Sequence, residues 1–282
     1  MEDKLPSDRA KATRKDLPPI ALLSDFGSRD HYVGVMKGVI AGLAPSAPII
    51  DLTHGVPAQC VTAGALALRE SWRFFPRRTV FLAVVDPGVG TARRAVAIET
   101  AAGARLVGPD NGVLWLAAEQ AKVKRAVELD APRYRLARVC DTFHGRDVFA
   151  PAAAYLWRGV ALRAFGPAVA DLARLDLGAV EQRARRLCGA VIYVDHFGNL
   201  ISNITREQFE DFAARFPGRG VSIKIGARAR VRLARTYAQS AAGAAMALFG
   251  SFELLEIAVR DASAARRFHA GAGTAVEVNI DR

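Results

Sequence analysis

The stretch VFLAVVDPGVGTARR, residues 80–94, constrains the fold of this chain more than any other. Val80 to Val85 are six consecutive apolar residues, mostly β-branched or aromatic, which is typical of a strand buried on both faces of a parallel sheet. The Pro and Gly residues that follow predict a tight turn, which would hold Asp86 at the carboxyl end of that strand, where open α/β sheets bind their ligands. Arg93 comes seven positions later and can fold back over the carboxylate. A plain surface turn explains this stretch equally well, so the rest of the chain has to decide.

The order of strand, polar turn and helix recurs along the first part of the chain. Predicted strands cover residues 20–24, 48–53, 80–85, 95–99 and 105–107, and predicted helices cover 32–43, 61–73, 113–121 and 149–157. Segments that alternate in this way form a mostly parallel sheet with helices on its faces. The pattern therefore predicts an α/β domain.

Polar residues gather in the turns of this predicted domain. They are Asp25, His54, Asp86, Asp110, Asn111 and His144. Any one of them alone is more simply explained as a solvated or hydrogen-bonded turn residue. Because six of them can share one edge of the sheet, we expect a common ligand site there.

Asp25 has two interpretations. The letters Asp25-Phe26-Gly27 match the metal-binding motif of kinases, but the Gly-rich loop, strand lysine and catalytic loop of kinases do not precede them. Asp is a common residue at a helix start, so it can be a cap for the helix predicted at 32–43. It can also accept hydrogen bonds from both hydroxyls of a ribose, as acidic residues do in nucleotide-binding α/β folds.

Composition limits the class of protein. The 282 residues suffice for one large domain or two modest ones. No apolar run approaches the roughly 20 residues of a membrane helix, so no membrane partner is expected. Three widely spaced cysteines, Cys60, Cys140 and Cys188, form neither a metal motif nor a disulfide framework, and we expect a reducing, cytoplasmic compartment.

The formal net charge of +11 raises the question of nucleic acid. The arginines are scattered, however, and no basic block stands beside interleaved aromatic residues. We interpret the charge as solvated surface and expect no nucleic-acid partner.

Beyond residue 187 the strand–helix alternation ends. AVIYV at 190–194 predicts a strand, the turn Asp195-His196-Phe197-Gly198-Asn199 follows it, and short strands are predicted at 221–225, 229–233 and 274–278. The predicted organisation is a disordered tail at 1–17, an α/β domain at 18–187 and a smaller β-rich domain at 188–282.

The motifs taken together resemble a known family. In chain order they are SDFG, IIDLTHGVP, VDPGVGTARR, GPDNG, TFHGRD, VDHFGNLISNI and GSFELLEIAV. This set is similar to that of the adenosine-forming S-adenosyl-L-methionine hydrolases, also called S-adenosylmethionine hydroxide adenosyltransferases, which are relatives of the fluorinase and chlorinase enzymes. The resemblance runs from about residue 20 to the C-terminus, and DPGVG, TFHGRD and DHFGN at these separations make it highly specific.

The resemblance implies a fold, an assembly and an activity. The fold is a Rossmann-like N-terminal α/β domain with a β-barrel-like C-terminal domain. The assembly is a homotrimer, in which each ligand lies between the N-terminal domain of one subunit and the C-terminal domain of the next. The activity is hydrolysis of S-adenosyl-L-methionine to adenosine and L-methionine, with no metal and no cofactor.

The resemblance also assigns roles to residues of this sequence. The catalytic Asp, Arg and His of the family fall on Asp86, Arg93 and His144. The substrate-binding set has a ribose carboxylate, a methionine-amino contact, two adenine contacts, a residue near the methionine carboxylate and the aromatic residue of TFHGRD. Asp25 matches the ribose carboxylate, Asp195 the methionine-amino contact, and Phe197 and Asn199 the adenine contacts. Ser251 matches the residue near the methionine carboxylate, and Phe143 is the aromatic residue of TFHGRD.

Gly145 and Asp86 distinguish this chain from its halogenating relatives, and the turn after Ser251 departs from the usual family sequence. Gly145 stands where halogenating relatives have a halide-binding Ser, and Asp86 stands where they have an uncharged residue, so the resemblance favours water over halide as the nucleophile. Phe252-Glu253 follows Ser251 where the family usually has a small residue or Gly.

Two other classes of function remain open at the level of sequence. A metal-dependent phosphohydrolase can use Asp and His at strand ends to bind Mn²⁺ or Mg²⁺, although no HD or HxH pair occurs at these turns. A non-catalytic sensor of S-adenosylmethionine or adenosine would be stabilised by its ligand without turnover.

Overall fold

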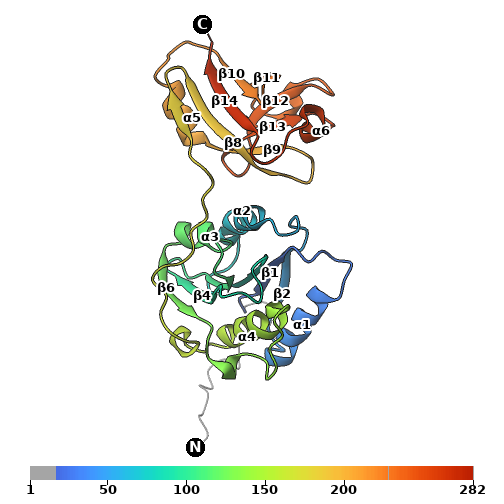
Figure 1. The fold of residues 1–282 in the computed structure, drawn as a ribbon, viewed down its shortest axis with the longest axis vertical. Coiled ribbons are helices and arrows are strands. Elements are labelled where there is room, and N and C mark those ends of the chain that lie inside the picture. The colour runs from blue at the N-terminus through green and yellow to red at the C-terminus, as the bar shows by residue number, and fades with distance from the viewer. Residues whose placement is uncertain (1–16, 228, 282) are drawn as a thin grey trace, which may run out of the picture. The chain divides into compact units, whose positions relative to one another are not determined.

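The computed structural model describes residues 17–227 and 229–281. The predicted tail lies outside the described residues except for Leu17. The chain divides into two compact units, Met1–Leu175 and Asp176–Arg282 (Figure 1). The sequence pattern placed this division after residue 187, which lies within a strand of the second unit.

The first unit contains a six-stranded sheet in the order β2-β1-β3-β5-β4-β6. Its strands are β1 (Ile20–Ser24), β2 (Ile49–Thr53), β3 (Val80–Val84), β4 (Ala95–Thr100), β5 (Arg105–Pro109) and β6 (Val123–Glu128). Strands β2, β1, β3 and β5 are parallel neighbours, whereas β4 is antiparallel to both β5 and β6. The predicted mostly parallel α/β sheet is confirmed.

Helices cover both faces of this sheet, as Figure 1 shows, with α2 and α3 on one side and α1 and α4 on the other. The four helices are α1 (Tyr32–Leu43), α2 (Val61–Ser71), α3 (Trp115–Gln120) and α4 (Ala150–Trp157). Shorter helical turns occupy Trp72–Phe74, Pro132–Tyr134, Gly145–Phe149 and Leu162–Ala164. The turn at Gly145–Phe149 is a π turn that leads directly into α4.

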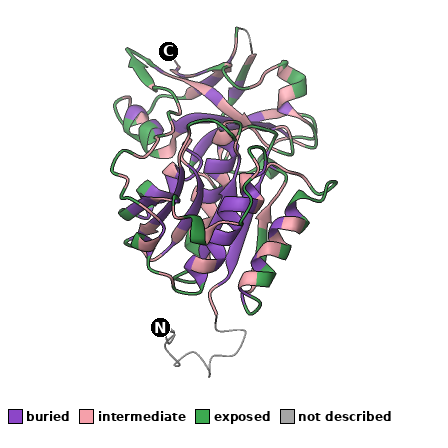
Figure 2. Ribbon diagram, turned by 60° about the horizontal axis from the view of Figure 1, so that its bottom comes forward, coloured by how far each residue is buried: buried purple, intermediate pink, exposed green. Residues whose placement is uncertain are grey.

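The core of the first unit follows from the alternation of strand side chains. Leu22 and Leu82 point to the face where Met36 and Ile40 of α1 pack, and all four are essentially inaccessible to solvent. On the opposite face, Gly64 of α2 lies against strand side chains, since a Cβ there would come within 3.0 Å of Val85. Figure 2 accordingly shows burial concentrated along the strands of this unit. Burial on both faces explains why β1 and β3 are continuous apolar runs.

The second unit is an antiparallel sheet in the order β11-β10-β14-β8-β9-β13-β12, with β7 paired to β8. Its strands are β7 (Glu181–Arg183), β8 (Arg186–Val194), β9 (Leu200–Thr205), β10 (Val221–Ile225), β11 (Ala229–Arg232), β12 (Ala245–Phe249), β13 (Leu254–Val259) and β14 (Ala275–Ile280). Its helices are α5 (Arg206–Ala213), α6 (Ala264–Phe268) and a 3₁₀ turn at Tyr237–Gln239.

The two edges of this second sheet approach each other. Leu233, just after β11, forms a bridge with Ala247 of β12, and the Ala234 amide donates to the Ala247 carbonyl over 2.8 Å. The sheet is therefore nearly closed on itself, which confirms the predicted barrel-like C-terminal domain. Within the described residues, no helix has both the length and the apolar character needed to cross a membrane.

Candidate active site

Asp86 and Arg93 form a buried ion pair at the carboxyl end of β3. The Arg93 Nε donates to Asp86 Oδ1 over 2.8 Å, and Nη2 donates to Oδ2, so the guanidinium binds the carboxylate in a bidentate manner. The side chains are only 5 % and 10 % exposed. Paired charge-assisted bonds of this kind fix orientation as well as charge. The plain surface turn allowed by the sequence is therefore wrong.

His144 completes this cluster from a distant part of the chain. Its Nδ1 lies 2.9 Å from Arg93 Nη2, and because a guanidinium has no acceptor, Nδ1 must accept this hydrogen bond. A neutral His144 ring then carries its proton on Nε2. Burial, and after it the positive charge of Arg93, hold the pKa of His144 below its usual value, so the imidazole is neutral at neutral pH.

The turn between Asp86 and Arg93 is shaped by glycine. Gly90 has φ +78, and a Cβ there would lie 2.7 Å from the carbonyl oxygen of Asp141. The close approach brings the turn after β3 against the segment that leads to His144. Gly90 thus helps to bring Arg93 and His144 together although they are 51 positions apart.

The turns after β1 and β2 lie on the same edge of the sheet. The Asp25 Oδ2 accepts a hydrogen bond from the Gln59 amide at 2.7 Å, whereas the N-cap of α1 is His31. The interpretation of Asp25 as the cap of this helix is therefore wrong. His54 joins the two turns, since its Nδ1 lies 2.7 Å from the hydroxyl of the buried Ser24.

Aromatic packing joins the Asp25 turn to the His144 segment. Phe26 contacts Phe143 edge-on, with ring centroids 6.0 Å apart. A Cβ at Gly145 would lie 3.1 Å from Met36 Sδ and 3.2 Å from the Phe143 ring. His144 is thus held between a close-packed Gly and a buried aromatic residue.

Two of the six predicted turn residues have structural roles. Asp110 accepts hydrogen bonds from Arg94 and from the Ala173 amide at 2.7–2.9 Å. The Asn111 Nδ2 donates to the Val85 carbonyl over 2.8 Å. Asn111 therefore supports the strand end that carries Asp86, and Asp110 joins Arg94 to the segment at Ala173. The expectation that both side chains belong to the common site stays a prediction.

The second unit carries the other predicted binding residues. Both oxygens of Asp195 accept hydrogen bonds from Asn199, one from its amide at 2.8 Å and one from Nδ2 at 2.9 Å, which fixes the turn after β8. Asn199 is buried, but Phe197 between them is 75 % exposed. Ser251 lies exposed in the turn between β12 and β13. Glu253 in this turn has φ +54, and its carboxylate pairs with Arg206.

Two supporting residues escaped the sequence analysis. The ring of Phe149 lies 5.2 Å from the Arg93 guanidinium carbon, a cation–π contact that helps to hold the arginine. Asp147 is fully buried, and it accepts hydrogen bonds from the Cys140 amide and from Arg146. The motif TFHGRD contained Asp147, and the available signal in the sequence was an acidic residue directly after the basic Arg146.

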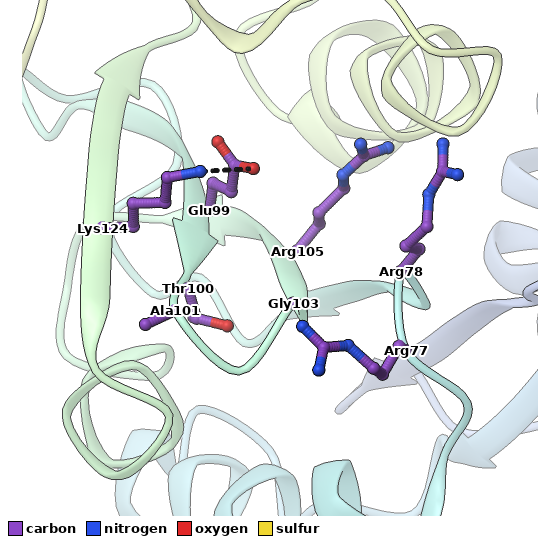
Figure 3. A pocket seen from close by; sticks show the side chains of 8 residues that line it. All are labelled: Arg77, Arg78, Glu99, Thr100, Ala101, Gly103, Arg105 and Lys124. Atoms are coloured by element: carbon purple, nitrogen blue, oxygen red, sulfur yellow. Dashed lines mark ion pairs between the residues drawn. The ribbon is translucent and has the colours of Figure 1, made fainter.

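The part of the chain that the structure describes contains no group of three or more His, Cys, Asp or Glu side chains arranged to hold a metal ion. A separate pocket of about 420 Å³ lies at the opposite, amino-terminal edge of the parallel strands, among Arg77, Arg78, Arg105, Lys124 and Glu99 (Figure 3). It includes none of the predicted site residues.

Comparison with family models covers both units. Residues 20–166 match the SAM hydroxide adenosyltransferase N-terminal domain, and residues 189–277 match the corresponding C-terminal domain, where SAM is S-adenosylmethionine. The chain belongs to the SAM hydroxide adenosyltransferase family. The family predicted from the motifs is thus confirmed.

Individual members of the SAM hydroxide adenosyltransferase family are similar over most of their length. The (R)-S-adenosyl-L-methionine hydrolase of Thermus thermophilus is 43% identical over 256 residues, covering 87% of this chain and 93% of the relative. That of Salinispora arenicola is 41% identical, covering 88% and 92%. The fluorinase of Nocardia brasiliensis is more distant, at 29% identity, covering 93% and 97%.

Solved structures agree with this assignment. An uncharacterised conserved protein from Thermotoga maritima has a TM-score of 0.83 and 34% identity, covering 92% of this chain and 99% of that one. A conserved hypothetical protein from Thermus thermophilus has a TM-score of 0.74 and 38% identity, covering 93% and 100%.

Proposed function

We propose that this protein hydrolyses S-adenosyl-L-methionine to adenosine and L-methionine. The observation that carries the proposal is the Asp86–Arg93–His144 cluster at the carboxyl edge of the sheet, in which a buried ion pair contacts the half-buried His144. Support also comes from the hydrolases of the family, which are 41–43% identical in the two examples above.

The chemistry needs an oriented water more than it needs an acid. The sulfonium of the substrate makes the ribose 5′ carbon electrophilic, and the neutral thioether leaves without protonation. Water attacks that carbon in line with the C–S bond, the C–O bond forms as the C–S bond breaks, and the water loses one proton. Holding the water in line can supply several kcal/mol of the barrier reduction.

The cluster divides these tasks between two side chains. Each carboxylate oxygen of Asp86 has a lone pair beyond the one that accepts from Arg93, so Asp86 can take the water proton. His144 accepts from Arg93 at Nδ1 and presents a donor at Nε2. We therefore assign proton acceptance to Asp86, orientation of the water to His144, and orientation of both to Arg93.

The remaining predicted residues are proposed to bind substrate. Asp25 accepts from the ribose hydroxyls and Phe143 lines the ribose side of the site. Asp195 binds the methionine amino group, Phe197 and Asn199 contact adenine, and Ser251 lies near the methionine carboxylate. The fixed Asp195–Asn199 turn and the exposed Phe197 ring are consistent with a preformed binding surface.

We further propose that the enzyme acts as a cytoplasmic homotrimer with each substrate shared between two subunits. This proposal rests on the resemblance of the motifs, and the placement of the proposed catalytic cluster and the Asp195 turn in different compact units of the chain is compatible with it.

Chromatography of S-adenosylmethionine incubated with the pure protein tests the activity, and adenosine with methionine is the expected result. In heavy-oxygen water the label should enter the 5′ hydroxyl of adenosine. Adenosine without label, or ligand binding without turnover, would contradict the proposal.

Halide should not replace water. Gly145 offers no hydroxyl to bind a halide. The Asp86 carboxylate taken alone would repel chloride or fluoride by about 4 kcal/mol at 4 Å with an effective dielectric constant near 20, and the paired Arg93 offsets part of this repulsion. The same incubation with excess chloride or fluoride should therefore give adenosine. A 5′-halo-deoxyadenosine as the main product would contradict the role of Asp86.

A further inference from the structure

The pocket at the amino-terminal edge of the first sheet stands apart from the proposed catalytic residues. Its lining comes from the turn before β3, the start of β5, the end of β4 and β6, which are adjacent in the sheet order β3-β5-β4-β6. Asp86 and His144, in contrast, belong to the carboxyl edge. The cavity of about 420 Å³ is within the range of small-ligand sites.

The charge of the lining is strongly positive. Arg77, Arg78, Arg105 and Lys124 are cationic, and Glu99 is the one acidic side chain among the lining residues. Glu99 lies 3.6 Å from Lys124 and offsets that charge. Arg77 and Arg78 have no acidic partner among the residues that the structure describes.

Backbone contacts fix where these arginines stand. The Arg78 amide donates to the Gly103 carbonyl over 2.9 Å, and Arg78 itself has φ +68, which holds two consecutive arginines in one tight turn. The Arg77 head group lies over Gly103, where a Cβ would come within 3.2 Å of Nε. Gly103 has φ +92, so a glycine there serves both the turn and the approach of Arg77.

Arg105 is anchored from the other side. Its Nη1 donates to the Leu156 carbonyl of α4 over 2.9 Å. In Figure 3, Arg78 and Arg105 extend in the same direction while Arg77 lies close to Gly103. The anchored Arg105 guanidinium loses little conformational entropy when an anion binds, and the planar forks of all three arginines match phosphate oxygens.

We propose that this pocket binds the phosphate chain of a small molecule, a diphosphate or triphosphate group. Three guanidinium groups around a cavity of this size, with the Lys124 charge offset by Glu99, match a compact ligand with several negative charges. A ligand with only one carboxylate would leave most of these positive charges unneutralised. A free inorganic chain and the phosphates of a nucleotide share this chemistry, so the experiment has an arm for each.

Isothermal titration calorimetry with pyrophosphate at low ionic strength tests the site on the full chain. The informative variant is the double substitution Arg77→Gln with Arg78→Gln, which keeps the alkyl stems on an exposed turn. The matched control is Arg163→Gln with Arg215→Gln, which removes the same charge from exposed arginines that are not among the lining residues of the pocket. We expect the first variant to weaken pyrophosphate binding about tenfold or more and the control to change it less than about twofold.

Three results would overturn the proposal: no binding of pyrophosphate to the unmodified protein, equal binding by the Arg77/Arg78 variant, or equal losses in both variants. Binding of an RNA oligonucleotide without pyrophosphate binding would also overturn it and would indicate a nucleic-acid surface. Tripolyphosphate and ATP, the latter with excess adenosine present, form the second arm. Equal affinities for tripolyphosphate and ATP support an inorganic chain as the ligand, and tighter binding of ATP supports a nucleotide. In either case the Arg77/Arg78 variant must weaken the binding of both compounds.

The test does not depend on catalysis. Neither arginine belongs to the proposed catalytic cluster, so we expect the Arg77/Arg78 variant to hydrolyse S-adenosylmethionine at the rate of the unmodified protein. Failure of the anion site and failure of the proposed function therefore give different results.

Discussion

Arg93 and Arg94 are successive residues, and each forms an ion pair with an aspartate that follows a strand. Arg93 holds Asp86 after β3, and Arg94 holds Asp110 after β5. The two pairs differ in their further partners. Arg93 of the first pair also contacts His144, whereas the second pair contacts the Ala173 amide and Asp171. We propose that the first pair serves catalysis and that the second, similar pair serves structure, so the two can be compared directly.

Substitution of each aspartate separates these roles. We expect Asp86→Asn to lower kcat about 100-fold or more, because the amide cannot accept the water proton, while adenosine still binds. Asp110→Asn is the matched control and should lower the unfolding temperature with kcat nearly unchanged. Steady-state kinetics and thermal melts measure both, and near-normal turnover by the Asp86 variant would contradict the assigned base.

The pKa of His144 predicts a pH dependence. A lowered pKa means that the neutral ring, which accepts from Arg93, persists as pH falls past about 6.5, the usual value for His. Activity should therefore remain at that pH and decline only at lower values, where His144 gains a proton. Nuclear magnetic resonance titration of the ring in the free protein measures the pKa directly.

Arg93→Gln is the informative partner for that titration. It removes a positive charge beside the ring and leaves Asp86 unpaired, and both changes should raise the pKa of His144. A titration midpoint at or above 6.5 in the unmodified protein would contradict the lowered pKa of His144, and no rise in the variant would contradict the contribution of Arg93 to it.

At the scale of elements, the turn after β3 controls the cluster through Gly90. We expect Gly90→Ala to destabilise the fold by about 1–3 kcal/mol and to reduce turnover, because the new methyl group would meet the Asp141 carbonyl. Gly218→Ala is the control, since Gly218 has a similar φ of +75 but no atom within 4 Å of the added Cβ. Denaturant unfolding should show a larger loss for Gly90→Ala, and equal losses would mean that the contact with Asp141 is unimportant.

The elements also show how far sequence alone could lead. The apolar runs of β1 and β3 were predictable because burial on both faces excludes polar residues. Strand β6, VKRAVE, was missed because it lies at the sheet edge and its first three residues are exposed. The direction of β4 was also out of reach, since a buried strand has the same composition in either orientation. Helix α5 did carry a readable signal, the capping box of Thr205 and Gln208.

Prediction of the site followed the same physical limits. The position of Asp86 at a strand end was predictable from the local pattern alone. The contact between Arg93 and His144 depends on folding of segments 51 positions apart, and the sequence pattern showed only that their turns can share an edge. Asp110 and Asn111 satisfied the same pattern, and their structural partners became visible only in the folded chain.

At the scale of the whole molecule, the proposed trimer makes a quantitative prediction. Asp86→Asn and Asp195→Asn damage different units of the chain, so a site shared between subunits can combine two intact halves. Random exchange of equal amounts should restore about one quarter of the unmodified activity, because each shared site has a one-in-four chance of receiving both intact halves. Recovery is measured after subunit exchange, which labelled subunits must demonstrate.

Mixing without exchange provides the control for that experiment. Absence of recovery despite demonstrated exchange would contradict shared sites, and a monomeric mass in solution would contradict the trimer itself. Neither result would affect the assignment of Asp86, since that residue is tested in the homogeneous protein.

The π turn at Gly145–Phe149 has a consequence for comparison among relatives. A π turn amounts to one residue inserted into an α-helix, and each residue of an α-helix turns the chain by about 100°. A relative lacking one residue here could keep α4 intact and still direct its histidine away from the arginine. If His144 has the role proposed above, a single-residue gap in this segment of aligned family sequences would mark members that retain the fold after losing the reaction.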